Sequence, residues 1–290
     1  MNRLLPLAVL AALAACGGSE APEPTPEPAA TEEPAAEAPS AEAAPEDPGL
    51  DLSALDGGSE TVALVPSPVE TQSALEEAGI ETKLESLIPK HEFDIQNADT
   101  DHAAVRTGVI LADALLTVKS AESEVLVKRL SGVQRGLGQL GGGDDIKTMI
   151  DDMKERIQAD AVTRDELLKE FDELSGAVIP ELEFNGQDRV VPLIQAGSWL
   201  EGANLVAKAI KAKGKDGAAA ADRLLKQPAV VDYFIGYVKS EGADKAPAAV
   251  TAKLEESLGR LKEIASKTEP LGPKDIDVVI TVTDDVLTLL

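Results

Sequence analysis

From about residue 61 to residue 290, apolar side chains recur at helical spacing, and no segment alternates strictly between apolar and polar residues over six positions. Strict alternation is typical of a half-buried strand, whereas a period of 3.6 residues is typical of an amphipathic helix. We therefore expect an all-α fold, an irregular multi-helix bundle of about 9–11 helices. The region 61–290 is predicted to be a single domain. The absence of a fixed-period repeat argues against a solenoid.

Capping and breaking residues divide this region into segments. Ser67 followed by Pro68 is typical of a helix start, and Thr163 with Glu166 has the pattern of a capping box. Glycine and proline end several of the segments. The expected helices are 68–78, 81–88, 100–120, 122–140, 144–159, 164–184, 188–213, 216–226, 229–240, 248–267 and 273–290. Segment 100–120 is apolar around most of its circumference, which predicts a helix buried at the centre of the bundle.

The N-terminus has the features of an export signal. Arg3 is followed by an apolar run over residues 4–15, which is too short for a permanent membrane span. The run ends in Leu-Ala-Ala before Cys16 and Gly17, and this ending resembles the lipobox of bacterial lipoprotein signal peptides. The resemblance implies a signal peptide over 1–15 and a membrane anchor on Cys16, the only cysteine of the chain. The alternative is an ordinary secretory signal followed by a chance cysteine.

Residue 17 bears on the membrane to which the lipid would be sorted. By the rule known for enteric bacteria, an Asp at this position retains a lipoprotein at the inner membrane. The chain has Gly17 instead. The resemblance therefore implies an outer-membrane lipoprotein of the bacterial cell envelope, facing the periplasm or the cell surface.

The stretch after Cys16 is predicted to be a disordered linker, which together with Cys16 covers residues 16–60. Residues 17–50 hold eight Pro and eight Glu, and Ala is the commonest of the others. Such a segment cannot bury enough apolar surface to offset its chain entropy. We expect a passive tether without a binding role, extended at roughly 3 Å per residue where it is polyproline-like.

The charge of the chain excludes one class of partner. The chain has 27 Lys+Arg against 52 Asp+Glu, a formal net charge of −25, and phosphate backbones repel such a chain. We therefore expect no nucleic-acid binding. Much of the charge belongs to the N-terminal part, because residues 83–290 hold 26 basic and 36 acidic side chains.

Three short patterns resemble ligand-binding motifs, but in each case an ordinary structural role is favoured over ligand binding. Gly136, Gly138 and Gly141 match a dinucleotide-binding spacing, but the required strand and βαβ unit are missing, so helix termination is preferred.

Residues 97–101 alternate like a calcium loop, but 102 is not Gly and 108 is not Glu, so capping by Asp99 or Thr100 is preferred. His91, Asp101 and His102 are weak metal candidates, together with Glu92 and Asp94, without a recognised ligand spacing.

Polar side chains interrupt the two most apolar segments. Arg106 and Asp113 lie in 100–120, and Glu201 and Asn204 lie in 188–213 beside Trp199, the only tryptophan. Because buried charges must be paired, we expect these helices to touch and Arg106 to meet Asp113 or Glu201. The pair either fixes the helix register or forms part of a polar pocket with Trp199 on one wall.

Catalysis has no support in the sequence, which has no Gly-x-Ser-x-Gly and no Ser-x-x-Lys motif. Since lipidation would consume Cys16, no free thiol would remain. We therefore expect no enzyme activity, no catalytic residues and no cofactor, and a hydrolase is the least favoured alternative.

Three motifs together resemble an uncharacterised family of all-helical bacterial lipoproteins. They are Pro-Ser-Pro-Val-Glu over 66–70, Gly-Val-Ile-Leu-Ala-Asp over 108–113 and Gly-Ser-Trp-Leu-Glu-Gly over 197–202. The likeness covers about residues 65–210, and the chain departs from it at Arg106 and Ser198. The resemblance implies fold and location, and it marks Asp113, Trp199 and Glu201 for testing.

Two functional hypotheses follow. The first is a non-enzymatic, lipid-anchored scaffold or partner-binding domain, whose partners are the membrane through Cys16 and another envelope protein or a cell-wall component. The second is a module that binds a small ligand or metal in a polar pocket around Arg106, Asp113, Trp199, Glu201 and Asn204.

Overall fold

The computed structural model describes residues 68–80, 83–88, 94–242 and 248–288. Within these ranges every regular element is a helix, which confirms the predicted all-α fold. The predicted signal peptide, Cys16 and the predicted linker lie outside the described residues.

The helices follow the predicted segments closely. In chain order they are α1 (Pro68–Glu77), the 3₁₀ turn η2 (Leu84–Leu87), α2 (Thr100–Thr117), α3 (Ser123–Gln139), α4 (Asp144–Gln158), α5 (Arg164–Phe184), the 3₁₀ turn η3 (Asp188–Val190), α6 (Val191–Lys213), the 3₁₀ turn η4 (Gly214–Gly217), α7 (Ala218–Leu225), α8 (Pro228–Tyr237), the π turn η5 (Val238–Gly242), α10 (Ala248–Ala265) and α11 (Pro273–Leu287).

Two segments differ from the prediction because of proline. The expected helix 188–213 is divided into η3 and α6, and Pro192 lies in the first turn of α6, where its missing N–H costs no hydrogen bond. The expected helix 81–88 is reduced, within the described residues, to the single turn η2. Ile88 after it is extended, as a residue before a proline tends to be.

Side-chain caps fix two of the helix starts. The Asp99 carboxylate accepts hydrogen bonds from the backbone N–H groups of Asp101 and His102 at the start of α2. At the start of α5, the Thr163 hydroxyl accepts from the Glu166 backbone N–H, and the Thr163 backbone donates to the Glu166 carboxylate. The capping box predicted from the sequence is therefore present.

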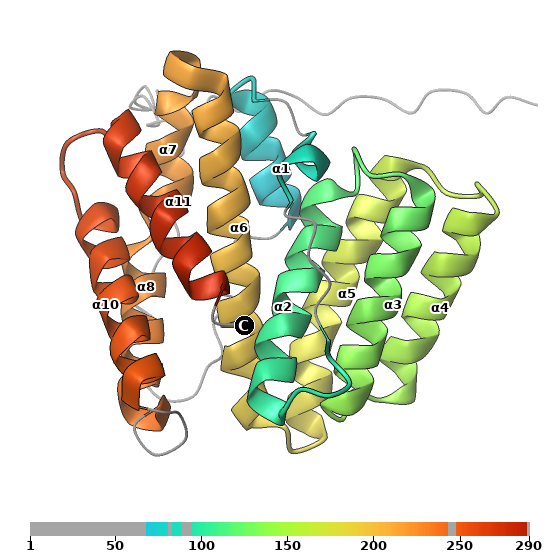
Figure 1. Cartoon of the computed structure of the whole chain (residues 1–290). Coiled ribbons are helices and arrows are strands. Elements are labelled where there is room, and N and C mark those ends of the chain that lie inside the picture. Colours follow the sequence, from blue (N-terminus) through green and yellow to red (C-terminus); the bar gives the residue numbers. More distant parts are fainter. Residues whose placement is uncertain (1–67, 81–82, 89–93, 243–247, 289–290) are drawn as a thin grey trace, which may run out of the picture. The chain divides into compact units, whose positions relative to one another are not determined.

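The described helices form two groups on either side of the boundary between α2 and α6 (Figure 1). Helices α2–α5 pack around one apolar cluster, which includes Phe171 and Leu174. Helices α1, α6, α7, α8, α10 and α11 pack around a second apolar cluster, which includes Leu205 and Leu261. Each of the two central helices also contributes to the other cluster, α2 through Val109 and α6 through Ile194.

Helices α2 and α6 cross at two glycines. A Cβ atom on Gly108 would lie 2.0 Å from the Ile194 carbonyl oxygen, and one on Gly197 would lie 2.1 Å from the Val105 carbonyl oxygen. Since real Cβ atoms do not approach backbone this closely, the crossing requires glycine at both positions. The two helices run in the same direction through this contact (Figure 1).

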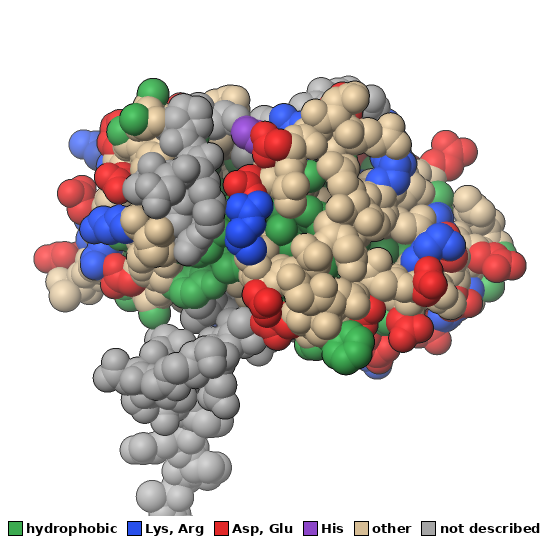
Figure 2. All heavy atoms as spheres, turned by 90° about the horizontal axis from the view of Figure 1, so that it is seen from below, with side chains coloured by type: hydrophobic (Ala, Val, Ile, Leu, Met, Phe, Trp, Pro, Cys, Tyr) green, Lys and Arg blue, Asp and Glu red, His purple; other side chains and the backbone are tan. Residues whose placement is uncertain are grey.

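The surface of the described part is mixed in charge. Figure 2 shows acidic and basic side chains interspersed on the face seen there, without a large field of one sign. No helix among the described residues combines the length and the apolar character that crossing a membrane requires.

Candidate functional site: a buried carboxyl pair

Two carboxyl groups meet inside the domain, one from each central helix. Asp113 of α2 is 6% exposed and Glu201 of α6 is 0% exposed. The two carboxyl groups lie close enough for each to act on the pKa of the other. The sequence prediction that α2 and α6 touch and bring these two acids into one cluster agrees with this arrangement.

The two carboxyl groups lack hydrogen-bond donors from the other described residues. Oδ1 of Asp113 and both carboxyl oxygens of Glu201 are buried, and no N–H or hydroxyl donor of the described residues reaches them. Two ionised carboxylates cannot hydrogen-bond to each other, because neither has a proton to donate. The contact between them therefore requires at least one proton.

The charged groups around the pair have partners of their own. Arg129 of α3 binds Glu85 of η2, with Nη1–Oε2 at 2.5 Å and Nη2–Oε1 at 3.2 Å. Lys208 of α6 lies 3.0 Å from Oδ1 of Asp284 on α11. These two ion pairs flank the carboxyl pair, and neither cation hydrogen-bonds to it.

Two neutral side chains complete this polar cluster. The Asn204 amide donates to Thr283 Oγ1 at 2.8 Å and to Asp284 Oδ1 at 2.9 Å, while its own Oδ1 has no donor. The Thr117 hydroxyl receives a hydrogen bond from Arg129 at 2.6 Å and donates to the backbone carbonyl of Asp113. Both side chains are fully buried, so the cluster tightly connects α2, α3, α6 and α11.

Burial makes both acids weak. It raises the pKa of Asp113 to about 7; the nearby Arg129 charge and the close approach of Glu201 partly offset this rise. Burial and then the Asp113 charge raise the pKa of Glu201 well above its ordinary range. The proton belongs to the pair and not to either carboxyl group alone. The chemistry open to such a pair is to hold and release a proton near neutral pH.

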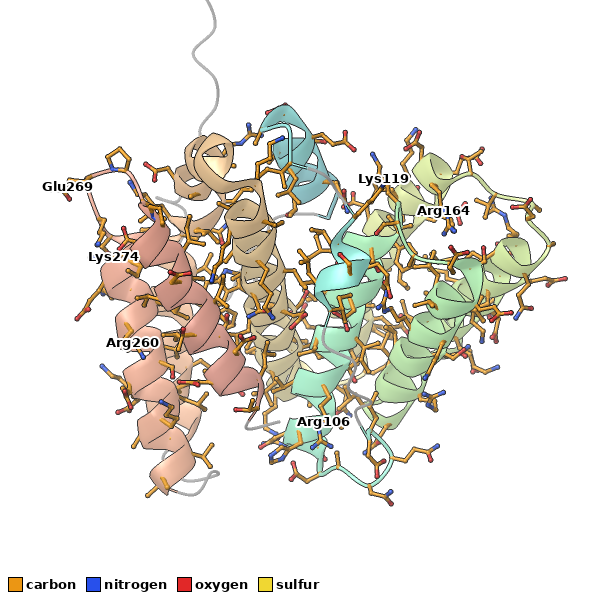
Figure 3. All side chains as sticks on the ribbon, turned by 45° about the horizontal axis from the view of Figure 1, so that its top comes forward. Arg106, Lys119, Arg164, Arg260, Glu269 and Lys274 are labelled. Atoms are coloured by element: carbon orange, nitrogen blue, oxygen red, sulfur yellow. The ribbon has the colours of Figure 1, made fainter. Side chains whose placement is uncertain are left out.

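Arg106 does not belong to this cluster. Its guanidinium donates to the Asp94 backbone carbonyl at 2.6 Å. Figure 3 places Arg106 near the start of α2, with Lys119 past the opposite end. Seven residues separate Arg106 from Asp113, which is roughly 10 Å along a helix axis. The arginine that acts on Asp113 is Arg129, which replaces the predicted partner.

Trp199 lies on a different side of α6 from Glu201. The two residues are separated by about 200° around the helix. The indole N–H of Trp199 donates to Gln227 Oε1 at 2.9 Å, and its ring packs at a centroid distance of 5.6 Å from that of Phe234. The polar pocket that was predicted with Trp199 on one wall is therefore not a single site. The carboxyl pair lies on one side of α6, and Trp199 lies on another.

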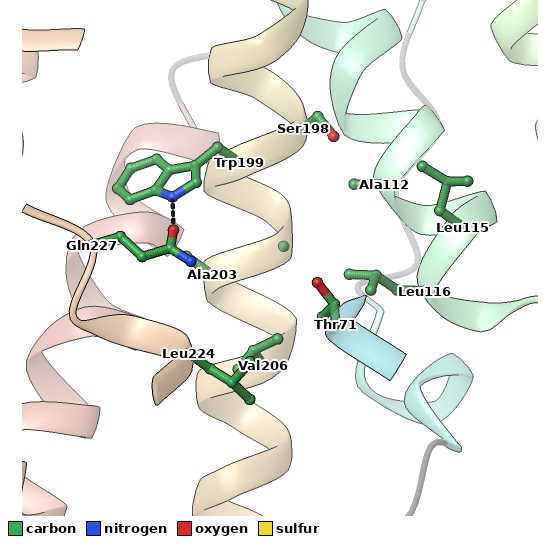
Figure 4. Close-up of a pocket in the computed structure, with 11 residues that line it drawn as sticks. Thr71, Ala112, Leu115, Leu116, Ser198, Trp199, Ala203, Val206, Leu224 and Gln227 are labelled. Atoms are coloured by element: carbon green, nitrogen blue, oxygen red, sulfur yellow. Dashed lines mark hydrogen bonds between the residues drawn. The ribbon is translucent and has the colours of Figure 1, made fainter. Parts of the chain in front are cut away.

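A small pocket adjoins Trp199 between α1, α2, α6 and the α7–α8 connection (Figure 4). Its volume is about 50 Å³, and its lining is mostly apolar, with Thr71, Ser198 and Gln227 as the polar members. Pockets for metabolites or drug-sized ligands are larger, at roughly 300–1,000 Å³. The space suits a few waters or one small apolar group.

The weak metal candidates have structural roles where they are described. His102 Nδ1 lies 2.7 Å from Asp99 Oδ2 in the helix cap, and Asp101 pairs with Arg189 at 2.7 Å. His91 lies outside the described residues. Among the residues that the structure describes, no three His, Cys, Asp or Glu side chains come together to hold a metal ion.

The glycine pattern at 136–141 also has a structural role. Gly136 lies within α3, where a Cβ atom would meet the Thr107 hydroxyl of α2 at 2.0 Å. Gly141 has a φ of 91° just after the helix and lets the chain turn. Gly141 therefore serves the predicted helix termination, and Gly136 serves close packing of α3 against α2, which was not predicted.

The sequence pattern indicated the two acids but not the charged side chains that lie around them. Arg129, Lys208 and Asp284 belong to amphipathic or exposed helix faces in the sequence, where charges are ordinary. No local signal distinguishes them from other surface charges. The segments 108–113 and 197–202, which carry the family resemblance, are the ones that supply the glycine crossing and the carboxyl pair.

Comparisons of the chain with protein families, with curated proteins and with solved structures found no match.

Proposed function

We propose that this chain is a lipid-anchored lipoprotein of the bacterial cell envelope, with a non-enzymatic helical domain that acts as a scaffold or binds a partner. The observation that carries the proposal is Cys16, the only cysteine, which directly follows an export-type apolar run. Two or more acyl chains on one residue give stable membrane attachment, whereas a single chain gives marginal attachment. The domain would then face the periplasm or the cell surface at the end of its tether.

The packed interior supports a role in binding rather than catalysis. The described helices enclose two continuous apolar clusters, and the pocket beside Trp199 is too small for most substrates. The exposed surface is then the place for recognition. Phe184 at the end of α5 is 88% exposed, more than any other large apolar side chain of the described residues, and we take it as the first position to test for a partner.

Lipidation is tested by expressing the full chain in bacteria fed an alkyne-tagged fatty acid. The wild type is expected to take up the tag and to fractionate with membranes, and Cys16→Ala is expected to lose both properties. Gly17→Asp is the matched control: it keeps the tag, and by the enteric sorting rule it moves the protein to the inner membrane. An untagged wild type with an N-terminus cut elsewhere than before Cys16 would contradict the proposal.

Partner binding is tested by placing a photo-crosslinking amino acid at Phe184 in the full chain, in living cells. We expect an adduct with an envelope protein or a cell-wall component that is absent when the same amino acid replaces Glu173, an exposed residue of the same helix. Equal adducts at both positions would indicate random collisions instead of a partner.

The small-ligand alternative keeps one point of support, the buried oxygens of Asp113, Glu201 and Asn204 that have no donor. Native mass spectrometry of the purified chain, prepared without chelators, tests it. Extra mass that disappears in Glu201→Gln would favour a bound ligand or metal at the carboxyl pair. A bare mass would favour the scaffold proposal.

A further inference from the structure

The carboxyl pair lies at the boundary between the two apolar clusters. Asp113 follows Gly108 by five residues on α2, and Glu201 follows Gly197 by four residues on α6. At 1.5 Å per residue, both acids lie roughly 6–8 Å beyond the glycine crossing, on the same side of it. The close backbone contact at the glycines holds the two helices together, and both carboxyl groups are buried beyond it.

Loss of the proton would leave this space with uncompensated charge. The groups that face the pair are Arg129 and Glu85, Lys208 and Asp284, and these form two ion pairs with one another. Each ion pair is close to neutral as a unit, so neither balances a second negative charge between α2 and α6. Two like charges in contact, away from water, cost far more than the same charges in solvent.

We propose that Asp113 and Glu201 form a pH-sensitive clamp between α2 and α6, closed by a shared proton and loosened when that proton is lost. The loosening would occur beyond the glycine crossing, where the pair lies, and would admit water between the two helices. The clamp would thereby couple the helices of the α2–α5 cluster to those of the α6–α11 cluster in a manner that depends on pH. This inference is independent of lipid attachment and of any partner.

The sign of the effect follows from the direction of the pKa shifts. Acids with raised pKa values bind more protons in the folded state than in the unfolded state, so stability falls as pH rises. The contribution of Asp113 is complete below its ordinary value of 3.8 and is lost by about pH 7. Glu201 extends the loss to higher pH. Each group can change the unfolding equilibrium constant by up to about tenfold per pH unit in its window.

The test is hydrogen exchange measured by mass spectrometry on the mature full chain between pH 5 and pH 8, with each variant compared to the wild type at the same pH. In the wild type and in Glu173→Gln, an exposed control on α5, peptides from the second half of α2 and the middle of α6 are expected to lose protection as pH rises. Glu201→Gln should weaken this dependence, because an amide at this position can donate to the Asp113 carboxylate and only Asp113 is left to titrate.

Infrared spectroscopy supplies a second readout that requires no variant to be stable. A protonated carboxyl has a carbonyl stretch that a carboxylate lacks, and the wild type is expected to show one that titrates near neutral pH. Should Glu201→Gln fail to fold, Asp113→Asn and this band decide the question. A wild type without the band, or variants that keep the pH dependence of the wild type, would overturn the clamp. Protection restored at pH 8 by Ca²⁺ or Mg²⁺, but not by Na⁺ at equal ionic strength, would overturn it in favour of a metal site.

Discussion

At the residue scale, Gly108 and Gly197 determine how closely the two central helices can approach. The atoms opposite these glycines are backbone carbonyls, which cannot move aside as the end of a flexible side chain can. The space at the crossing is therefore fixed by the main chain of both helices, and the positions of the neighbouring acids depend on it.

Gly197→Ala is expected to lower the free energy of unfolding by about 3 kcal/mol or more, the upper part of the range for overpacked sites. The added methyl group would meet the Val105 carbonyl oxygen at 2.1 Å, so α2 and α6 would have to separate. Urea unfolding followed by circular dichroism measures the change.

The control for this prediction is Gly259→Ala in α10, where a Cβ atom meets nothing within 4 Å. Here the substitution should increase stability by about 0.5–1 kcal/mol, because alanine loses less backbone entropy in a helix. Equal effects of the two substitutions would mean that the crossing is not as tight as the structure has it.

The charged partners of Asp113 and Glu201 could not be predicted from the sequence. A charge within an apolar helical segment is conspicuous in a sequence, and this identified Asp113 and Glu201. Arg106 is equally conspicuous, but its guanidinium binds the Asp94 backbone carbonyl, just before the start of α2. Which arginine approaches Asp113 depends on how α3 packs against α2, and hydrophobic periodicity does not determine that register.

At the element scale, the start of α5 depends on its capping box. Thr163→Ala is expected to lower the free energy of unfolding by about 1 kcal/mol, because the backbone N–H of Glu166 loses its acceptor. Thr148→Ala in α4 is the control: this exposed hydroxyl binds a carbonyl within its own helix, and its loss should have little effect. Thermal unfolding of both variants provides the comparison.

This cap also has a pH dependence opposite to that of the carboxyl pair. Hydrogen bonds from the backbone and side chain of Thr163 hold the pKa of Glu166 below its ordinary range. Its stabilising contribution is therefore present at neutral pH and is lost as pH falls below about 4.5. Thr163→Ala should weaken the acid sensitivity of the protein while leaving the sensitivity above pH 5 unchanged.

Helix positions were largely predictable from the sequence because their signals are local. Asp99, Thr163 and Pro192 each act on backbone groups within one turn, so their effect does not depend on the rest of the fold. Whether a short segment becomes an α-helix or a 3₁₀ turn is less predictable. Leu84–Leu87 form one 3₁₀ turn, in which the buried Leu84 contributes to the apolar cluster around α6.

At the scale of the whole molecule, the two apolar clusters share α2 and α6 and should therefore unfold together at neutral pH. Leu174→Ala in α5 and Leu261→Ala in α10 remove the same atoms from different clusters. Each is expected to cost about 2–5 kcal/mol and to shift one common transition. Circular dichroism and Trp199 fluorescence should report the same midpoint in each variant. Separate midpoints would show that the clusters unfold independently.

On each central helix, the glycine crossing fixes the number of residues between the glycine and the acid that follows it. Deleting one residue between Gly197 and Glu201 would rotate the acid by about 100° around α6 and away from Asp113. The same holds on α2 between Gly108 and Asp113. A chain that builds this pair in the same way would therefore have Gly-x₄-Asp on one helix and Gly-x₃-Glu on a later one, two intervals by which distant relatives could be recognised even where little else in their sequences agrees.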